Sequence, residues 1–458
     1  MTRLDAIIIG AGQAGPPLAG RLTAAGMKVA LIERKLFGGT CVNTGCMPTK
    51  TLVASAYAAH IVNRASDYGI VSAGATQIDM PKVKARADEV SAKARSGIER
   101  RLRSMDGCTV FQGHARFEGP NIVRVDQQQL TAPRIFINVG GRALIPDMPG
   151  INDVPYLTNS SILALEEVPR HLVVVGGSYV GLEFAQMYRR FGAQVTVIEK
   201  GPRLIGREDD DVSGEVRNIL EREDIAVRTG AACIGLAPHE QGVAVSIDCD
   251  EGSPDAIGSH VLLAVGRRPN TDDLGLDKAG VATDARGYIT VNDDLTTTVP
   301  GIWALGDCNG RGAFTHTAYN DFEIVAANLL DGEHRGVGAR VPAYALYIDP
   351  PLGRVGITEA EARALGRPLL IGMLPMSKVS RAVEKAETQG FMKVAVDEAT
   401  RRILGAAILG TGGDEAIHGL LDIVNADVPY DALQRAVPIH PTVSELIPTL
   451  LSKMKPAD

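Results

Sequence analysis

The chain has 458 residues, which at about 150 residues per domain predicts roughly three domains. Hydrophobic residues make up 45% of it and charged residues 22%, an ordinary globular balance that is sufficient for several cores. Asp and Glu outnumber Lys and Arg by 54 to 47, and this net charge of −7 argues against a nucleic-acid partner. Since no apolar run approaches the roughly 18 residues that cross a bilayer, we expect a cytoplasmic protein without a membrane partner.

The N-terminal segment carries the pattern of a nucleotide-binding βαβ unit. A short apolar run over residues 5–9 predicts a buried strand, which a glycine turn, a helical stretch and a second strand follow. Glycines in such a turn let a pyrophosphate approach the backbone, and the helix N-terminus favours its negative charge. An acid that closes the second strand accepts hydrogen bonds from ribose hydroxyls. The residues in these positions are Gly10, Gly12, Gly15 and Glu33.

Two cysteines five positions apart, Cys41 and Cys46, follow this unit. No second Cys or His pair has the spacing of a zinc site, so we predict no metal ligands. A structural disulfide is not expected in a cytoplasmic chain without a secretory signal. A redox-active pair remains, and a neighbouring helix N-terminus would favour its thiolate form. The other cysteines are scattered and are expected to be inert: Cys108, Cys233, Cys249 and Cys308.

The βαβ pattern returns after a shift of 166 residues, from Gly10 to Gly176. In both units the closing acid stands 23 residues after the first glycine, so the two units align without a gap. Two complete units in one chain predict two nucleotide sites. The second site would use Gly176, Ser178, Gly181 and Glu199.

Two departures from the simple pattern concern the second site. Ser178 replaces the middle glycine, so its side chain would either crowd the pyrophosphate or offer it a hydroxyl. Glu199 favours NADH because a carboxylate there repels the 2′-phosphate of NADPH, although Lys200 and Arg203 could offset that repulsion.

Six ordered motifs make nearly the whole chain resemble the class I flavin-dependent pyridine nucleotide–disulfide oxidoreductases. That family includes glutathione reductase, lipoamide dehydrogenase and mercuric reductase. The motifs are GTCVNTGCMPTK at 39–50, GGSYVGLE at 176–183, AVGRRPN at 264–270, IWALGD at 302–307, PPLGRVG at 350–356 and HPTVSE at 440–445.

The resemblance implies an α/β fold with two Rossmann-like dinucleotide-binding domains and a C-terminal α+β dimerisation domain. The expected segments are 1–146 for the first part of the FAD-binding domain, 147–267 for the NAD(P)-binding domain, 268–338 for the second part of the FAD-binding domain and 339–458 for the dimerisation domain. These boundaries are expected to hold within several residues.

The resemblance also implies roles for single residues. FAD would lie at the first unit and would contact Glu33, Gly39, Thr40, Lys50 and Asp307. Asp307 could equally be an ordinary helix cap. Lys50 and Glu183 would form an ion pair beside the isoalloxazine ring, and the alternative is two unrelated surface charges. Tyr179 would move aside when the nicotinamide stacks there, and the alternative is a core aromatic residue. Gly266 would contact the nicotinamide nucleotide.

The implied activity is a relay of two electrons from NADH or NADPH through FAD to a Cys41–Cys46 disulfide and on to an acceptor. Cys46 would lie nearer the flavin, and Cys41 would exchange with the substrate. His440, oriented by Glu445, would transfer protons and would come from the other subunit of a homodimer. Thr442 and Glu445 also fit a capping box at the start of the last helix, which is another use for the same carboxylate.

The acceptor stays open between a small disulfide and a soft metal ion, in a mercuric-reductase-like branch of the family. Residues 446–458 lack the cysteine pair that delivers mercury in mercuric reductases, and Pro438 stands where lipoamide dehydrogenases usually carry a second histidine. The alternatives are a lipoamide dehydrogenase, a glutathione-reductase-type enzyme, an NADH oxidase or transhydrogenase that does not use the cysteines, and a non-enzymatic nucleotide sensor.

Overall fold

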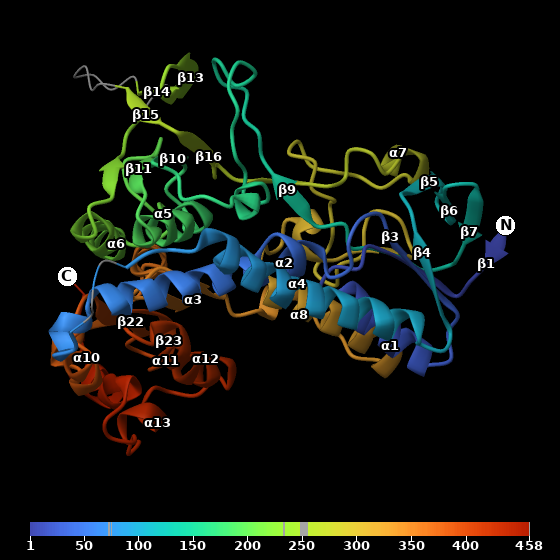
Figure 1. The fold of residues 1–458 in the computed structure, drawn as a ribbon. Coiled ribbons are helices and arrows are strands. Elements are labelled where there is room, and N and C mark those ends of the chain that lie inside the picture. Colours follow the sequence, from blue (N-terminus) through green and yellow to red (C-terminus); the bar gives the residue numbers. More distant parts are fainter. Residues whose placement is uncertain (72–73, 75, 232–233, 248–254, 458) are drawn as a thin grey trace.

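The structure is a computed structural model that describes residues 1–71, 74, 76–231, 234–247 and 255–457, so Cys233 and Cys249 lie outside the described residues. It has an α/β fold in which two parallel sheets with helices are followed by a C-terminal antiparallel sheet (Figure 1). Every helix in the described ranges is too short or too polar to cross a membrane.

The first parallel sheet has the strand order β18-β8-β2-β3-β4. Its strands are Ile302–Ala304, Ile135–Ile137, Ala6–Ile9, Val29–Glu33 and Cys108–Gln112. The three middle strands are buried throughout, which explains why their sequences are almost continuously apolar. Helix α1 (Gly15–Ala24) begins at the glycine turn and carries Pro16 and Pro17 in its first turn, where a missing N–H loses no helical hydrogen bond.

Smaller elements surround this first sheet. A mainly antiparallel sheet has the order β1-β7-β6-β5, with strands Thr2–Arg3, Gln128–Thr131, Ile122–Val125 and Ala115–Gly119. Strands β9 (Gly141–Ala143) and β17 (Arg267–Pro269) form an antiparallel pair. The remaining helices of this part are α7 (Leu276–Ala279) and α8 (Thr315–Ala326).

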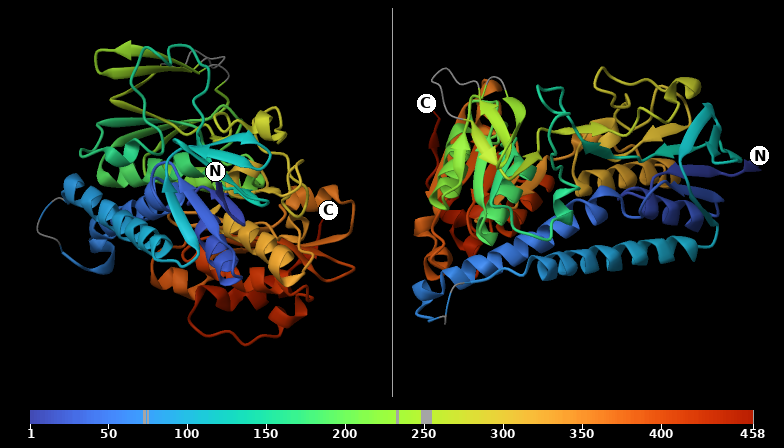
Figure 2. Two further views of the ribbon diagram at one scale, coloured as in Figure 1. Left: turned by 90° about the vertical axis from the view of Figure 1, so that its right-hand side faces the viewer. Right: turned by 45° about the horizontal axis from the view of Figure 1, so that its top comes forward.

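Among the described residues between β3 and β4 lie three α-helices, of which the first two carry the cysteines: α2 (Gly39–Asn43), α3 (Cys46–Asn63) and α4 (Met80–Arg103). The long helices α3 and α4 lie side by side along one side of the molecule (Figure 2). Because α3 also packs against α5 of the second unit, its N-terminus is held between the two nucleotide-binding units.

The second parallel sheet has the order β12-β11-β10-β16, with strands Ala226–Arg228, Gln194–Ile198, His171–Val175 and His260–Leu263. It is flanked by α5 (Tyr179–Phe191) and α6 (Asp210–Arg222). A small antiparallel sheet adds β13 (Ile234–His239), β14 (Gly242–Ile247) and β15 (Ala256–Gly258). Read in the opposite direction, the order β16-β10-β11-β12 repeats β8-β2-β3-β4 of the first sheet, so the predicted pair of Rossmann-like units is confirmed.

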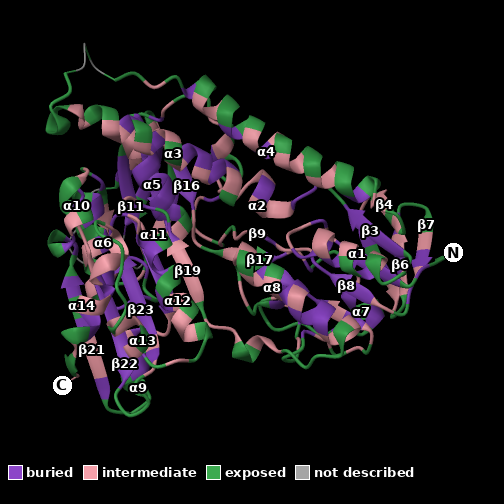
Figure 3. Ribbon diagram, turned by 90° about the horizontal axis from the view of Figure 1, so that it is seen from below, coloured by how far each residue is buried: buried purple, intermediate pink, exposed green. Residues whose placement is uncertain are grey.

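The C-terminal part is an antiparallel sheet of order β19-β20-β23-β22-β21-β24. Its strands are Ala343–Leu346, Leu352–Gly356, Ile403–Leu409, Phe391–Asp397, Leu369–Pro375 and Lys455–Pro456. Its helices are α9 (Glu359–Ala364), α10 (Ser380–Glu384), α11 (Gly413–Ala416), α12 (His418–Asn425), α13 (Asp431–Gln434) and α14 (Ile447–Ser452). Strands β22 and β23 are buried at its centre (Figure 3), as the predicted α+β domain requires.

Candidate active site

The two cysteines lie next to each other at the start of α3. Cys46 is the first residue of that helix, Cys41 lies in α2, and both are free thiols joined by a hydrogen bond between their side chains. Gly45 allows the tight turn between them, because a Cβ there would lie only 2.8 Å from the carbonyl oxygen of Thr40. The sequence places the pair in one loop, and the fold brings the sulfur atoms together.

Electrostatics separate the two thiols. Cys46 is exposed, and the hydrogen bond from Cys41, with help from Thr315 and Lys50, lowers its pKa to about 6. The Thr315 hydroxyl lies 3.4 Å from Cys46 Sγ, and the N-terminus of α3 favours negative charge at the same place. The hydrogen bond to Cys46, together with burial, raises the pKa of Cys41. At neutral pH the pair is therefore one thiolate, Cys46, and one thiol, Cys41.

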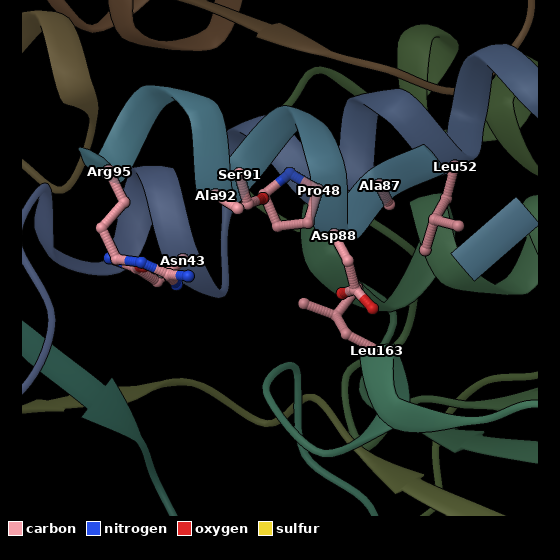
Figure 4. Close-up of a pocket in the computed structure, with 9 residues that line it drawn as sticks. All are labelled: Asn43, Pro48, Leu52, Ala87, Asp88, Ser91, Ala92, Arg95 and Leu163. Carbon is pink, nitrogen blue, oxygen red and sulfur yellow. Dashed lines mark hydrogen bonds between the residues drawn. The ribbon is translucent and has the colours of Figure 1, made fainter. Parts of the chain in front are cut away.

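Asn43 fixes the shape of the cysteine loop. Its Nδ2 donates to the carbonyl oxygens of Phe37 and Gly39, each at 2.9 Å, and its Oδ1 accepts from Arg95 Nη1 of α4 at 3.2 Å. A cavity of about 200 Å³ lies behind the loop, and the Ser91 hydroxyl there is buried with no hydrogen-bond partner among the described residues (Figure 4). The cavity has room for several water molecules.

Lys50 and Glu183 form an ion pair in which Lys50 Nζ lies 2.6 Å from Glu183 Oε2. Glu183, on α5, is only 6% exposed, and its other oxygen accepts from the backbone N–H of Tyr347 at 3.1 Å. The ammonium group also lies 4.7 Å from the centre of the Tyr347 ring. These are not two unrelated surface charges, since the pair joins the cysteine helix α3 to the second nucleotide-binding unit.

The first glycine turn leaves no room for side chains. A Cβ on Gly10 would lie 2.2 Å from the carbonyl oxygen of Asn138, and one on Gly15 would lie 2.3 Å from the carbonyl oxygen of Gly10. Glu33 closes the unit with both oxygens engaged, because it accepts from the N–H groups of Ala11 at 2.9 Å and Lys35 at 2.8 Å. A bare backbone turn with a fixed carboxylate beside it suits a dinucleotide.

The second turn repeats this arrangement. A Cβ on Gly181 would lie 2.1 Å from the carbonyl oxygen of Gly176, and Ser178 between them is exposed. Glu199 accepts from the N–H groups of Gly177 at 2.6 Å and Gly201 at 2.7 Å, which are the same two positions of the repeat. The geometry therefore supports two nucleotide sites, as the repeat predicts.

Asp307 caps no helix of the described residues and pairs with Arg267. The short helical turn Gly306–Asn309 has Leu305 at its N-cap and no side-chain cap, so the helix-cap alternative is wrong. Burial raises the pKa of the Asp307 carboxyl, and the nearest cation is Arg267, whose Nη2 lies 3.5 Å away. Arg267 also donates to the carbonyl oxygen of Gly141 at 2.6 Å and to Thr40 Oγ1 at 3.5 Å.

His440 and Glu445 form a pair near the C-terminus, with His440 Nδ1 2.7 Å from Glu445 Oε2. The His440 side chain is 73% exposed, whereas that of Glu445 is only 8% exposed. The Thr442 hydroxyl donates to the carbonyl oxygen of Ile439 and caps no helix, so the predicted capping box is wrong. The exposed Val437 and Ile439 lie beside the histidine in sequence.

Some residues of the site were not singled out from the sequence. Arg267 was seen only as part of a motif, and Asn138 lies against the first glycine turn through Gly10 and Gly12. Thr315 contacts Cys46, and the next residue, His316, stacks on Phe314. No sequence pattern marks Asn138 or Thr315, because each reaches the site from a distant segment.

Comparisons with known proteins agree along the whole chain. The family model described as pyridine nucleotide-disulphide oxidoreductase matches residues 4–321, and the model of its dimerisation domain matches residues 342–451. The chain is 35% identical to the probable pyridine nucleotide-disulfide oxidoreductase RclA of Escherichia coli, with 99% of this chain and 100% of that protein covered. It is 33% identical to a dihydrolipoyl dehydrogenase of Thermus scotoductus, with coverage of 97% and 96%.

Two further similarities concern a mercuric reductase and a solved structure. The chain is 31% identical to a mercuric reductase of Streptomyces lividans, with coverage of 97% and 95%. A solved structure described as the Cu(II) complex of the HOCl-induced flavoprotein disulfide reductase RclA from Escherichia coli superimposes with a TM-score of 0.90, at 34% identity and with 99% of each chain covered.

Proposed function

Because the chain belongs to the pyridine nucleotide-disulphide oxidoreductase family, we propose that it uses NADH, FAD and the Cys41–Cys46 pair to reduce a small disulfide or a soft metal ion. The observation that carries this proposal is the Cys46 thiol, which starts α3, lies 3.4 Å from the Thr315 hydroxyl and has its pKa lowered to about 6 by its neighbours, above all by Cys41. A thiolate with an adjacent thiol is what thiol–disulfide exchange requires.

The first nucleotide unit fits FAD. Its glycine turn carries no side chains, since an added Cβ would clash with the backbone, and two backbone N–H groups hold the Glu33 carboxylate in place beside the turn. Asp307 supports this fit, because its side chain is 25% exposed and its carboxylate, which pairs with Arg267, could also accept a hydrogen bond from a ligand hydroxyl. When bound, FAD supplies the two-electron carrier that the sulfur pair lacks. The residues proposed to hold it are Gly10, Gly12, Gly15, Glu33, Gly39, Thr40, Lys50 and Asp307, to which we add Asn138 and Arg267.

We assign the second unit to the nicotinamide nucleotide, with NADH preferred to NADPH. The residues would be Gly176, Ser178, Gly181, Glu199 and Gly266. The fixed Glu199 carboxylate would repel a 2′-phosphate, and the Asp210 carboxylate, which pairs with Arg203, would compete with that phosphate for the guanidinium. Steady-state kinetics should give a KM for NADH at least roughly tenfold below that for NADPH. A lower KM for NADPH would contradict the assignment.

The chemistry at sulfur follows from the two unequal thiols. The pKa of Cys41 is raised, so this thiol needs a base before it can attack an acceptor disulfide. His440 is suited to accept that proton, because Glu445 orients its ring and its other nitrogen is free to face a partner subunit. Cys41 then forms a mixed disulfide and releases one acceptor thiolate, after which the Cys46 thiolate attacks Cys41 and releases the second.

The proposed acceptors are supported by the relatives rather than by a binding site. One similar structure is described as a Cu(II) complex of a disulfide reductase, and another relative is a mercuric reductase, so a thiophilic metal ion joins small disulfides as a candidate. Lipoamide, which is a small cyclic disulfide, is a second candidate because of the dihydrolipoyl dehydrogenase from Thermus, although Pro438 in place of a histidine argues against it.

The test is an acceptor screen with the purified holoenzyme that follows NADH loss. Small disulfides, Cu(II) and Hg(II) should be compared with lipoamide for the wild type, the Cys41→Ser variant and a Cys108→Ser control. Cys41→Ser should lose acceptor turnover by roughly 100-fold or more, whereas the control should keep it. Full turnover by Cys41→Ser would instead support the NADH oxidase or transhydrogenase alternative.

A further inference from the structure

A buried carboxylate joins the nicotinamide motif to the C-terminal sheet. Glu208, in the segment between β11 and α6, is 1% exposed. Its Oε1 accepts from the hydroxyl of Tyr179 at 3.2 Å and from the hydroxyl of Tyr344 at 2.7 Å. Tyr179 is the first residue of α5, whereas Tyr344 lies on β19, and their rings meet edge to face with centres 5.5 Å apart. Tyr179 is therefore not simply a core aromatic residue, since a charged acceptor fixes its hydroxyl.

The hydrogen bonding of Glu208 depends on these two tyrosines. Its Oε2 hydrogen-bonds to none of the described residues and faces Arg354 Nε at 3.6 Å. Arg354 is 2% exposed and stands directly opposite Tyr344 in the β19–β20 pair. The guanidinium balances the charge of Glu208 at a distance too long for a hydrogen bond. If one tyrosine leaves, the other is the remaining donor to a carboxylate that water does not reach.

The same tyrosines lie between the nicotinamide motif and the thiol pair. The Tyr344 ring stacks on Phe314, with centres 5.6 Å apart and planes 13° from parallel. Phe314 directly precedes Thr315, whose hydroxyl contacts Cys46 Sγ. Any movement of Tyr179 therefore takes place in a packed aromatic group that borders both parts of the site.

We propose that Glu208 is a positioning residue that holds Tyr179 in the place seen here, and that a nicotinamide ring must break the Tyr179–Glu208 hydrogen bond to bind. This proposal rests on the proposed function, which assigns nucleotide binding to the second unit. Tyr344 has a complementary role, because its hydroxyl still donates a hydrogen bond to Glu208 when Tyr179 moves. The two tyrosine hydroxyls thus have opposite effects on the cost of nicotinamide binding.

The test compares NAD⁺, which carries the nicotinamide ring, with ADP-ribose, which lacks it. Calorimetric titration of the oxidised holoenzyme gives both dissociation constants without turnover. Tyr179→Phe should bind NAD⁺ about three- to tenfold more tightly, because no hydrogen bond has to be broken. Tyr344→Phe should bind NAD⁺ about three- to tenfold more weakly, because Glu208 then loses its last donor when Tyr179 moves. ADP-ribose binding should stay within about twofold of wild type in both variants.

A matched control is Tyr188→Phe, which removes another tyrosine hydroxyl from α5, one that donates to the carbonyl oxygen of Ile162. It should change neither dissociation constant. Both test variants keep the Glu208–Arg354 charge pair, and their thermal unfolding should stay close to that of the control. Parallel changes in NAD⁺ and ADP-ribose binding would overturn the proposal, as would shifts of the same sign in the two variants or no shift in either. A wild-type protein that binds neither ligand would overturn the proposed function as well.

Discussion

At the scale of single residues, the proposed chemistry depends on the unequal pKa values of the Cys41 and Cys46 thiols. The largest cause of the low pKa of Cys46 is the hydrogen bond from Cys41, so removing that donor should raise it. The rate of alkylation of the reduced wild-type enzyme by iodoacetamide should rise through an inflection near pH 6. In Cys41→Ala the inflection should move up by about one pH unit or more.

A smaller shift in the same direction is expected for Thr315→Val, because this change removes a second hydrogen bond to Cys46 and keeps the shape of the side chain. Thr317→Val is the matched control, since Thr317 lies on the same helix and its hydroxyl bonds to Phe314 instead. An inflection near pH 8 in the wild type would contradict the assignment of Cys46 as the thiolate.

At the scale of elements, the glycine turns set what the two βαβ units can hold. A Cβ on Gly15 would lie 2.3 Å from the carbonyl oxygen of Gly10, so Gly15→Ala must push helix α1 away from the turn. Overpacking of this kind costs about 1–3 kcal/mol, and FAD affinity should fall by about 5- to 100-fold. Flavin absorbance after gel filtration measures the retained fraction. The control is Gly20→Ala on the same helix, where the added Cβ would lie no closer than 3.7 Å to any other atom, so this variant should retain FAD. Equal retention of FAD by both variants would contradict the prediction.

The two βαβ units could be predicted from the sequence, because the repeat that starts at Gly10 and again at Gly176 is a local pattern. Its glycines and acids occupy the positions that dinucleotide binding requires. The structure adds that Glu33 and Glu199 bind the same two backbone positions in each unit. Local patterns were less informative at Thr442, where the capping-box spacing is present but Glu445 bonds to His440 instead.

The parts that the sequence could not predict are contacts between distant segments. Glu208 lies among ordinary acidic residues of the segment before α6, and only the fold brings it to Tyr179 and Tyr344. Arg354 was visible as part of a motif, yet its cross-strand place opposite Tyr344 depends on the register of the C-terminal sheet. No periodicity encodes such pairings.

At the scale of the whole molecule, a buried ionic cluster joins the second unit to the C-terminal sheet. Lys393 is 5% exposed, and its Nζ lies 2.6 Å from Glu359 and 2.7 Å from Asp211. Burial opposes ionisation of Asp209, but the backbone N–H groups of Ala360 and Glu359, together with Lys393, hold the pKa of its carboxyl below the usual value. Hydrogen bonds from Lys393 and Arg363 likewise outweigh burial and lower the pKa of Glu359.

This cluster predicts how stability depends on pH. Carboxyls with lowered pKa values stabilise the folded protein above their ordinary pKa, near 4, and this contribution is lost as the pH falls through their folded values. Lys393→Met should lower the midpoint of thermal unfolding by about 5 °C at pH 7, because it removes the cation that Asp209, Asp211 and Glu359 share. The difference from wild type should narrow below about pH 4. If the two unfolding midpoints differ by the same amount at every pH, the carboxylate charges around Lys393 do not contribute to stability.

The exposed side chain of His440 suggests that this histidine acts on the active site of a second subunit. We propose a homodimer in which His440 of one subunit serves the cysteines of the other, and the exposed Val437 and Ile439 beside it in sequence suit an interface. Cys41→Ser and His440→Ala should each be inactive as homodimers. Co-expressed together, they should recover about a quarter of wild-type activity, because half of the randomly mixed dimers contain one intact site. No recovery would place the histidine and cysteines of each site on the same chain.

The three parts of the fold also support a proposal for the domain boundaries. We place them near residues 147, 268 and 339, since the chain changes sheet between β9 and β10, between β16 and β18, and between β18 and β19. The FAD-binding domain is then built from two segments, with the nicotinamide-binding domain inserted between them. Cleavage by a protease at limiting concentration should begin near these positions.

The two backbone N–H groups bound to Glu199 have a consequence for protein engineering. Gly177 and Gly201 both donate to this carboxylate, so the acid holds its own loop together in addition to any contact with a ribose. Exchanging it for a neutral or basic side chain, an obvious route to an enzyme that accepts NADPH, would strand two amide hydrogens at the same time. A successful redesign would therefore have to introduce replacement acceptors for those amides together with the new positive charge.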